Sequence, residues 1–97
     1  MTSPELDPTE TPGRRTATIL LLDDDRVIAT LVRGALPEPN YEVAWVTTVA
    51  EAMKETATRR PDLALVDISL NEETGWDFLE RVRASDVTRR LPVVMPE

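Results

Sequence analysis

The sequence contains no cysteine and no histidine. The missing cysteine excludes disulfide bonds, thiolate nucleophiles and sulfur-ligated zinc. The missing histidine excludes Ser-His-Asp triads, imidazole metal ligands and a histidine general base. Chemistry in this chain therefore depends on carboxylates, hydroxyls and backbone groups. Carboxylate and carbonyl oxygens favour hard cations such as Mg²⁺.

Long apolar runs and an excess of basic residues are also absent. No segment approaches the roughly 20 apolar residues that a membrane-spanning helix needs. The 18 acidic residues outnumber the 11 basic ones, giving a net charge of −7, which disfavours nucleic-acid binding. We expect a soluble, cytoplasmic protein that binds neither nucleic acid nor a membrane.

The chain has 97 residues, enough for one small domain at most. Residues 1–15 contain three prolines and hardly any large apolar side chain, so we predict a flexible tail there. Residues 16–97 remain to fold as one domain, which is near the size where a single core is marginal.

From Ala17 onward, segments typical of strands and helices alternate. The apolar runs at 19–22 and 63–66 show no alternation, which indicates strands buried on both faces. The spacing of apolar residues indicates the helices, and helix-breaking residues such as proline mark where they end. The expected order is a strand at 19–22, a helix at 27–35, a strand at 41–46, a helix at 49–59, a strand at 63–66, a helix at 75–83 and a strand at 92–95.

Each predicted helix has an apolar stripe that should face the sheet. The stripes consist of Val27, Ile28, Leu31, Val32 and Ala35 in the first helix, Val49, Ala52, Met53 and Thr56 in the second, and Trp76, Phe78, Leu79 and Val82 in the third. This alternation predicts an α/β fold with a parallel sheet and helices on its faces.

Aspartates follow two of the predicted strands. Asp23, Asp24 and Asp25 come directly after the first apolar run, and Asp67 comes directly after the third strand. Functional groups gather at the carboxyl ends of parallel strands. The aspartates could form a pocket whose self-repulsion is relieved by a divalent cation. Alternatively, the three aspartates at 23–25 serve only to cap a helix, and Asp67 only begins a solvated loop.

Several segments together resemble the response-regulator receiver domains of two-component signalling. The segments are Leu20–Asp25, Pro61–Leu70, Gly75 eight residues beyond Asp67, and Leu91–Met95. The resemblance covers about residues 17–95 and implies a flavodoxin-like, doubly wound parallel sheet. It also implies an incomplete, C-terminally truncated domain of about four strands and three helices, without the family's fifth strand and last two helices.

The resemblance assigns roles to single residues. Asp67 matches the phosphoacceptor, which takes a phosphoryl group from a histidine kinase or phosphotransfer protein. Asp23 and Asp24 match the acidic pair that binds Mg²⁺, together with Asp67 and the backbone carbonyl at Ser69. Asp25 has no family role, and we interpret it as a helix cap. The chain would be a phosphorelay phosphoprotein and not an enzyme.

Three departures from the family pattern weaken the expected activity. Asn71 replaces a loop proline, and Glu97 stands where the family has a switch Ser or Thr. The only lysine, Lys54, is in the second predicted helix and cannot replace the family's phosphate-binding lysine. We expect weak Mg²⁺ binding, slow phosphorylation, and marginal stability or self-association through an uncovered sheet.

Two other functions stay open. A receiver-like binding module or remnant would dock to a kinase or receiver without being productively phosphorylated. A phosphatase of the haloacid-dehalogenase type would use Asp23 as its nucleophile and Asp25 as its acid, because the Asp23-x-Asp25 pattern also resembles that family's first motif. The phosphatase interpretation leaves Asp67 without a role.

Overall fold

The structure is a computed structural model that describes residues 16–96. The elements of this region are β1 (Ala17–Leu22), α1 (Arg26–Ala35), β2 (Tyr41–Val46), α2 (Val49–Arg59), β3 (Leu63–Val66), α3 (Gly75–Ala84) and β4 (Val93–Val94). Each of the seven predicted elements is confirmed. The predicted tail at 1–15 and the predicted switch position at Glu97 lie outside the described residues.

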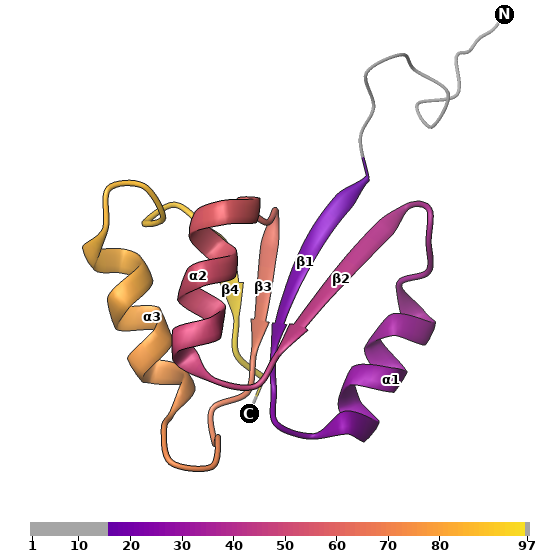
Figure 1. Ribbon diagram of the computed structural model, residues 1–97, viewed down its shortest axis with the longest axis horizontal. Coiled ribbons are helices and arrows are strands. Elements are labelled where there is room, and N and C mark those ends of the chain that lie inside the picture. Colours follow the sequence, from indigo (N-terminus) through magenta and orange to yellow (C-terminus); the bar gives the residue numbers. More distant parts are fainter. Residues whose placement is uncertain (1–15, 97) are drawn as a thin grey trace, which may run out of the picture.

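The four strands form one parallel sheet in the order β2-β1-β3-β4. Strand β1 is central, paired with β2 from Ala17 to Leu22 and with β3 from Ile19 to Leu22. Figure 1 shows α2 and α3 lying together beside β3 and β4, while α1 lies apart from them next to β2. All strands run in one direction, so their carboxyl ends meet at one edge of the sheet.

One face of the sheet is closely packed against α2 and α3. Its core consists mainly of Leu20, Leu22, Ala64 and Val66 from the sheet and Val49, Ala52, Phe78 and Val82 from the two helices. Alternate residues of a strand point to opposite faces, so this core uses every second residue of β1 and β3. The prediction that α2 turns Val49, Ala52 and Thr56 inward is confirmed.

The opposite face, next to α1, is less covered. Only Ala29 of α1 is buried, while Val27 and Leu31 are each 63% exposed. The predicted stripe on this helix exists, but the expectation that it is buried is wrong. The prediction that both faces of the strand are buried is confirmed for β1. It is wrong for β3, where Leu65 stays half-buried. Helix α1 contacts β2, which explains why the β3 side of this face remains open.

Two further expectations need correction. Trp76 is 55% exposed and does not belong to the buried stripe of α3. It is two residues before Phe78, and positions two apart point to nearly opposite sides of a helix. Strand β4 covers only Val93–Val94, because the flanking Pro92 and Pro96 have no N–H group to donate to a ladder.

Side-chain caps fix where the helices begin. The Asp25 carboxylate accepts a hydrogen bond from the Val27 N–H at 2.8 Å, so its predicted role as a cap is confirmed. Thr48 caps α2 in the same way. Thr74 and Asp77 form a capping box at the start of α3, which the Thr-x-x-Asp spacing would have indicated.

Strand β2 is at an edge of the sheet. The carbonyls of Asn40 and Val46 accept hydrogen bonds from the β1 side, so the Val43 carbonyl points outward. The Arg33 guanidinium donates a hydrogen bond to this Val43 carbonyl at 3.4 Å. None of the three helices between residues 16 and 96 is long and apolar enough to cross a membrane.

Candidate metal centre

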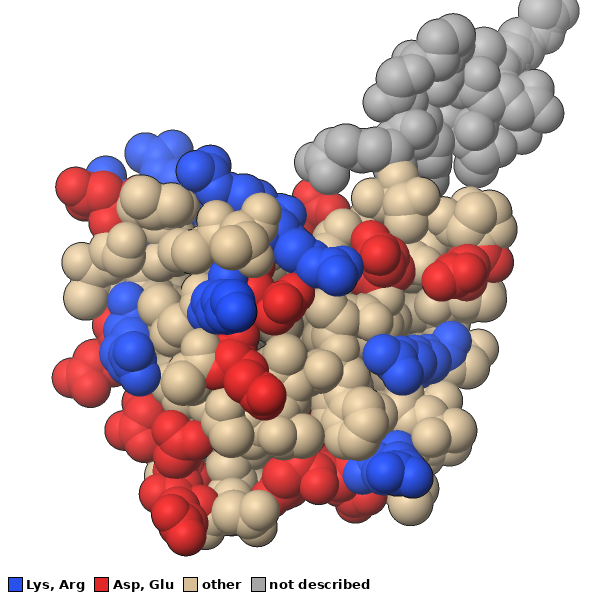
Figure 2. All heavy atoms as spheres, in the orientation of Figure 1, with Lys and Arg blue, Asp and Glu red and all other residues tan. Residues whose placement is uncertain are grey.

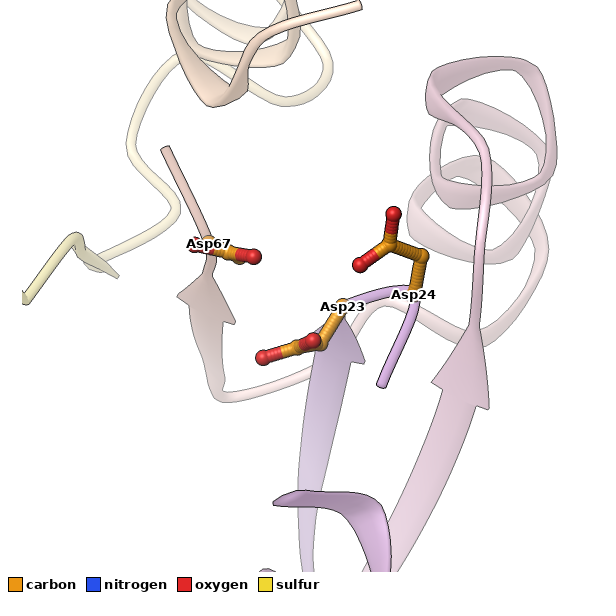
Figure 3. A group of neighbouring side chains, drawn as sticks. All are labelled: Asp23, Asp24 and Asp67. Carbon is orange, nitrogen blue, oxygen red and sulfur yellow. The ribbon is translucent and has the colours of Figure 1, made fainter. Parts of the chain in front are cut away.

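Asp23, Asp24 and Asp67 meet at the carboxyl ends of β1 and β3. One carboxylate oxygen from each lies within 4.8 Å of the other two. Figure 3 shows Asp67 on one side and the Asp23–Asp24 pair on the other, with carboxylates directed into the space between them. The sequence placed these groups on separate strands, and the parallel pairing of β1 with β3 brings them together.

Backbone hydrogen bonds extend the sheet by one residue into this site. The Asp67 N–H donates to the Leu22 carbonyl at 2.8 Å, and the Asp23 N–H donates to the Val46 carbonyl at 3.1 Å. The Asp23 carboxylate then accepts a hydrogen bond from the Asp25 N–H at 2.9 Å. The first aspartate of each strand end is therefore held by the rigid sheet.

Burial and the neighbouring carboxylates act on the carboxyl group of Asp23. Burial raises the pKa of the Asp23 carboxyl above its ordinary value. The hydrogen bond from Asp25 opposes this rise, and the negative charges of Asp67, Asp24 and Asp25 add to it. Figure 2 shows acidic side chains at the edge where the strands end, while other acidic and basic side chains are spread over the rest of this face. Such a cluster favours a bound cation.

Gly75 sets the distance between α3 and the strand that carries Asp67. Its N–H donates to the Ile68 carbonyl at 2.8 Å. A Cβ atom at this position would lie 2.5 Å from the Asp67 carbonyl oxygen and 2.8 Å from a methyl carbon of Val66. Both distances are far below van der Waals contact, so only glycine fits here.

The loop between β3 and α3 is fixed at two points. The Ser69 N–H donates a hydrogen bond to the Asp67 carboxylate at 3.3 Å. The role of the Ser69 carbonyl as a metal ligand stays a prediction. The Glu73 carboxylate accepts a hydrogen bond from the Val49 N–H at 3.2 Å, which ties the loop to the start of α2. The sequence contained no signal for this long-range contact.

A groove of about 430 Å³ runs from the carboxylates along the open face of the sheet. Its apolar lining includes Leu21, Ile28 and Leu65. No lysine or arginine lines it among the described residues, and Lys54 lies exposed on α2. An all-oxygen set of three carboxylates fits Mg²⁺, which prefers hard oxygen ligands and retains several waters.

Comparison with known proteins identifies the family and the fold. The family model of the response regulator receiver domain matches residues 19–96. The chain therefore belongs to the receiver-domain family of two-component systems. The four-stranded parallel sheet with three helices is the flavodoxin-like receiver fold, so the fold inferred from the family resemblance is confirmed.

Relatives of known name include the phosphate regulon transcriptional regulatory protein PhoB of Pseudomonas aeruginosa. It is 30% identical over 78 residues, which cover 80% of this chain and 34% of PhoB. The polar-differentiation response regulator DivK of Brucella anthropi is 28% identical over 78% of this chain and 62% of DivK. The chain spans about a third or less of the length of the transcriptional regulators it matches.

Solved structures agree with these relatives. The N-terminal domain of a response regulator receiver protein from Methanoculleus marisnigri has a TM-score of 0.75 and 32% identity, over 80% of this chain and 63% of that one. The receiver domain of the sensor histidine kinase PA1611 from Pseudomonas aeruginosa has a TM-score of 0.75 and 28% identity, over 82% and 66%. That structure holds a magnesium ion in its active-site cleft.

Proposed function

We propose that this chain accepts a phosphoryl group on Asp67 in a Mg²⁺-dependent reaction, with a histidine kinase or a phosphotransfer protein as the donor. The observation that carries the proposal is the meeting of three carboxylates from two strands within 4.8 Å. A purely structural role would not require uncompensated negative charges to be held together by the sheet. The receiver domain of PA1611, which holds magnesium in its cleft, supports the choice of ion.

The proposed step exchanges one phosphorus bond for another. A carboxylate oxygen of Asp67 attacks the phosphorus, the bond from phosphorus to the donor's imidazole nitrogen breaks, and that nitrogen keeps the electron pair. The product is an acyl phosphate on Asp67. Magnesium, held by Asp23, Asp24 and Asp67, would neutralise phosphoryl oxygens. The Ser69 N–H holds one Asp67 oxygen and so fixes the direction of the attacking carboxylate.

Mass spectrometry after incubation with acetyl phosphate and Mg²⁺ tests this proposal. We expect wild-type protein to gain the mass of one phosphoryl group, and Asp67→Asn to gain none. Asp86→Asn is the matched control, because the Asp86 side chain is 96% exposed and lies outside the site. Labelling of Asp67→Asn at the wild-type level, or labelling that is unchanged by chelation of the metal, would refute the proposal.

A second candidate is a binding module that is not productively phosphorylated. The groove beside Asp67 has no basic side chain in the described region, so a phosphoryl group would lack a protein cation to pair with. Magnesium binding without labelling by acetyl phosphate would favour this module. The phosphatase alternative would instead hydrolyse p-nitrophenyl phosphate, and it would lose activity in Asp23→Asn while keeping it in Asp67→Asn.

We also propose that two copies associate through the open face of the sheet. Val27 and Leu31 are each 63% exposed, and Ile28 is 37% exposed, which makes a continuous apolar stripe on α1 beside the groove. Sedimentation velocity should detect association that Leu31→Glu abolishes. Glu80→Gln, at an exposed position of α3, is a control outside this face. A wild-type protein that remains monomeric at high concentration would contradict the proposal.

A further inference from the structure

Trp45 contacts the backbone of the acidic site from the edge strand β2. Its indole N–H donates a hydrogen bond to the Asp23 carbonyl with a nitrogen-to-oxygen distance of 2.6 Å. This is shorter than the roughly 2.9 Å typical of such bonds. The contact is partly buried, and it joins residues that are 22 positions apart in the chain.

Strand β2 therefore holds Asp23 at both of its backbone polar groups. The Val46 carbonyl accepts the Asp23 N–H, and the neighbouring Trp45 side chain donates to the Asp23 carbonyl. The carbonyl belongs to the peptide group that joins Asp23 to Asp24. An indole N–H fixed on this oxygen limits rotation of that peptide group, and with it the position of Asp24.

A clamp of this kind has an electrostatic reason. Asp23, Asp24 and Asp67 repel one another when all are ionised, and the turn after β1 could relieve this by swinging Asp24 away from Asp67. Backbone hydrogen bonds hold Asp67 and the Asp23 N–H, and the Asp25 N–H restrains the turn through the Asp23 carboxylate. The indole bonds the Asp23 carbonyl itself, which belongs to the peptide that precedes Asp24. Tryptophan suits the position because its N–H can only donate.

We propose that Trp45 is a positioning residue of the cation site, which sets the spacing between the Asp23–Asp24 pair and Asp67 by holding the intervening peptide. The inference rests on the proposed function, since it takes Mg²⁺ as the ion that the three carboxylates bind. In this proposal Trp45 is not itself a ligand of the ion. It acts through the Asp23 carbonyl.

The chain offers a matched control in its other tryptophan. Trp76 is 55% exposed on α3, and its indole makes no hydrogen bond within the described region. Trp45→Phe and Trp76→Phe delete the same N–H group and conserve an aromatic ring. Only the first of them removes a donor from the acidic site.

Calorimetric titration of the full chain with MgCl₂ tests the inference. We expect Trp45→Phe to weaken Mg²⁺ binding about three- to tenfold, because groups that orient metal ligands typically affect affinity to this extent or more. Trp76→Phe should bind as the wild type does. Wild-type affinity in a folded Trp45→Phe variant would overturn the inference alone. Equally negligible binding by the wild type and by Asp67→Asn would refute the proposed function, and the inference would fall with it.

A spectroscopic measurement keeps the inference testable without substituting Trp45. In ¹⁵N-labelled Trp76→Phe protein, the only indole N–H signal belongs to Trp45. We expect this N–H to exchange slowly with solvent and to shift when Mg²⁺ is added, while the second indole signal of the wild type, which belongs to Trp76, does neither. A Trp45 indole that exchanges as fast as the Trp76 indole would show that the clamp is absent.

Discussion

The two faces of the sheet differ in how completely the helices cover them. Phe78 on the α2–α3 face is fully buried, whereas Leu31 on the α1 face is 63% exposed. Apolar burial is the main favourable term in folding, so the packed face stabilises the domain, whereas the α1 face leaves apolar side chains exposed in the described region. Asp23 and Asp67 directly follow β1 and β3, whose side chains alternate between the two faces. The site therefore lies at the edge of the sheet where the packed face and the open face meet.

The largest effect should come from the centre of the packed face. Phe78→Ala removes a fully buried ring and should lower the free energy of unfolding by about 3–5 kcal/mol. Leu31→Ala on the open face should change it by less than about 1 kcal/mol, since little apolar area is lost. Urea titrations followed by circular dichroism measure both values. Equal losses of unfolding free energy in the two variants would contradict the conclusion that the packed face contributes more to stability than the open face.

A smaller loss is expected where the packed face supports the site. Gly75→Ala forces a methyl group to within 2.5 Å of the Asp67 carbonyl oxygen, so α3 or β3 must shift. We expect destabilisation of about 1–3 kcal/mol together with weaker Mg²⁺ binding. Gly34→Ala on α1 is the control, because nothing lies within 4 Å of a Cβ atom there. An unchanged Mg²⁺ affinity in Gly75→Ala would show that Mg²⁺ binding does not depend on the close packing of α3 against β3.

At the boundary itself, removing charge should stabilise the metal-free protein. A carboxyl whose folded pKa is raised adds stability below its ordinary pKa of 3.8, and loses it as the pH rises through the raised value. Ionised Asp23 therefore costs stability at neutral pH. Asp23→Asn should raise the free energy of unfolding in the absence of Mg²⁺.

The gain from Asp23→Asn should shrink when Mg²⁺ is added, because the ion stabilises the wild type by binding its folded state. Thermal melts at pH 7, with and without Mg²⁺, measure the difference. Asp86→Asn, at a 96% exposed side chain, should leave the melting temperature unchanged in both conditions. A lower melting temperature for metal-free Asp23→Asn would contradict the electrostatic account.

The smallest effects concern the helix caps on the two faces. Thr74→Ala removes the cap of α3 on the packed face and should lower global stability by about 1 kcal/mol. Asp25→Ala removes the cap of α1, a helix with one buried residue. Its effect should show as faster amide exchange confined to α1. Uniform acceleration of exchange across the sheet in Asp25→Ala would mean that α1 folds as one unit with the rest.

The sequence was sufficient for the order of elements and for the grouping of the aspartates. Apolar runs such as 63–66 and abrupt polar ends such as Asp67 are local signals, and parallel pairing turns them into one site. The exposure of the α1 stripe could not be predicted. Periodicity shows which side of a helix is apolar, but it does not show how much of the sheet lies beneath that side.

Contacts between distant segments were also beyond local patterns. The Glu73 carboxylate caps α2 from a loop 24 residues away, and the Trp45 indole bonds the Asp23 carbonyl across 22 residues. Their residue types are common in surface loops and edge strands. Only the folded arrangement shows that these side chains have partners at the site.

The hydrogen bond from Arg33 to the outward Val43 carbonyl restricts how molecules of this protein can assemble. An open edge strand invites a further strand from another chain, and repeated addition of this kind produces fibrils. The guanidinium occupies the middle of the acceptor row on β2, and an incoming backbone would first have to displace it. Growth of the sheet past β2 is therefore hindered, and this protection applies to the β2 edge alone, because β4 forms the opposite edge of the sheet.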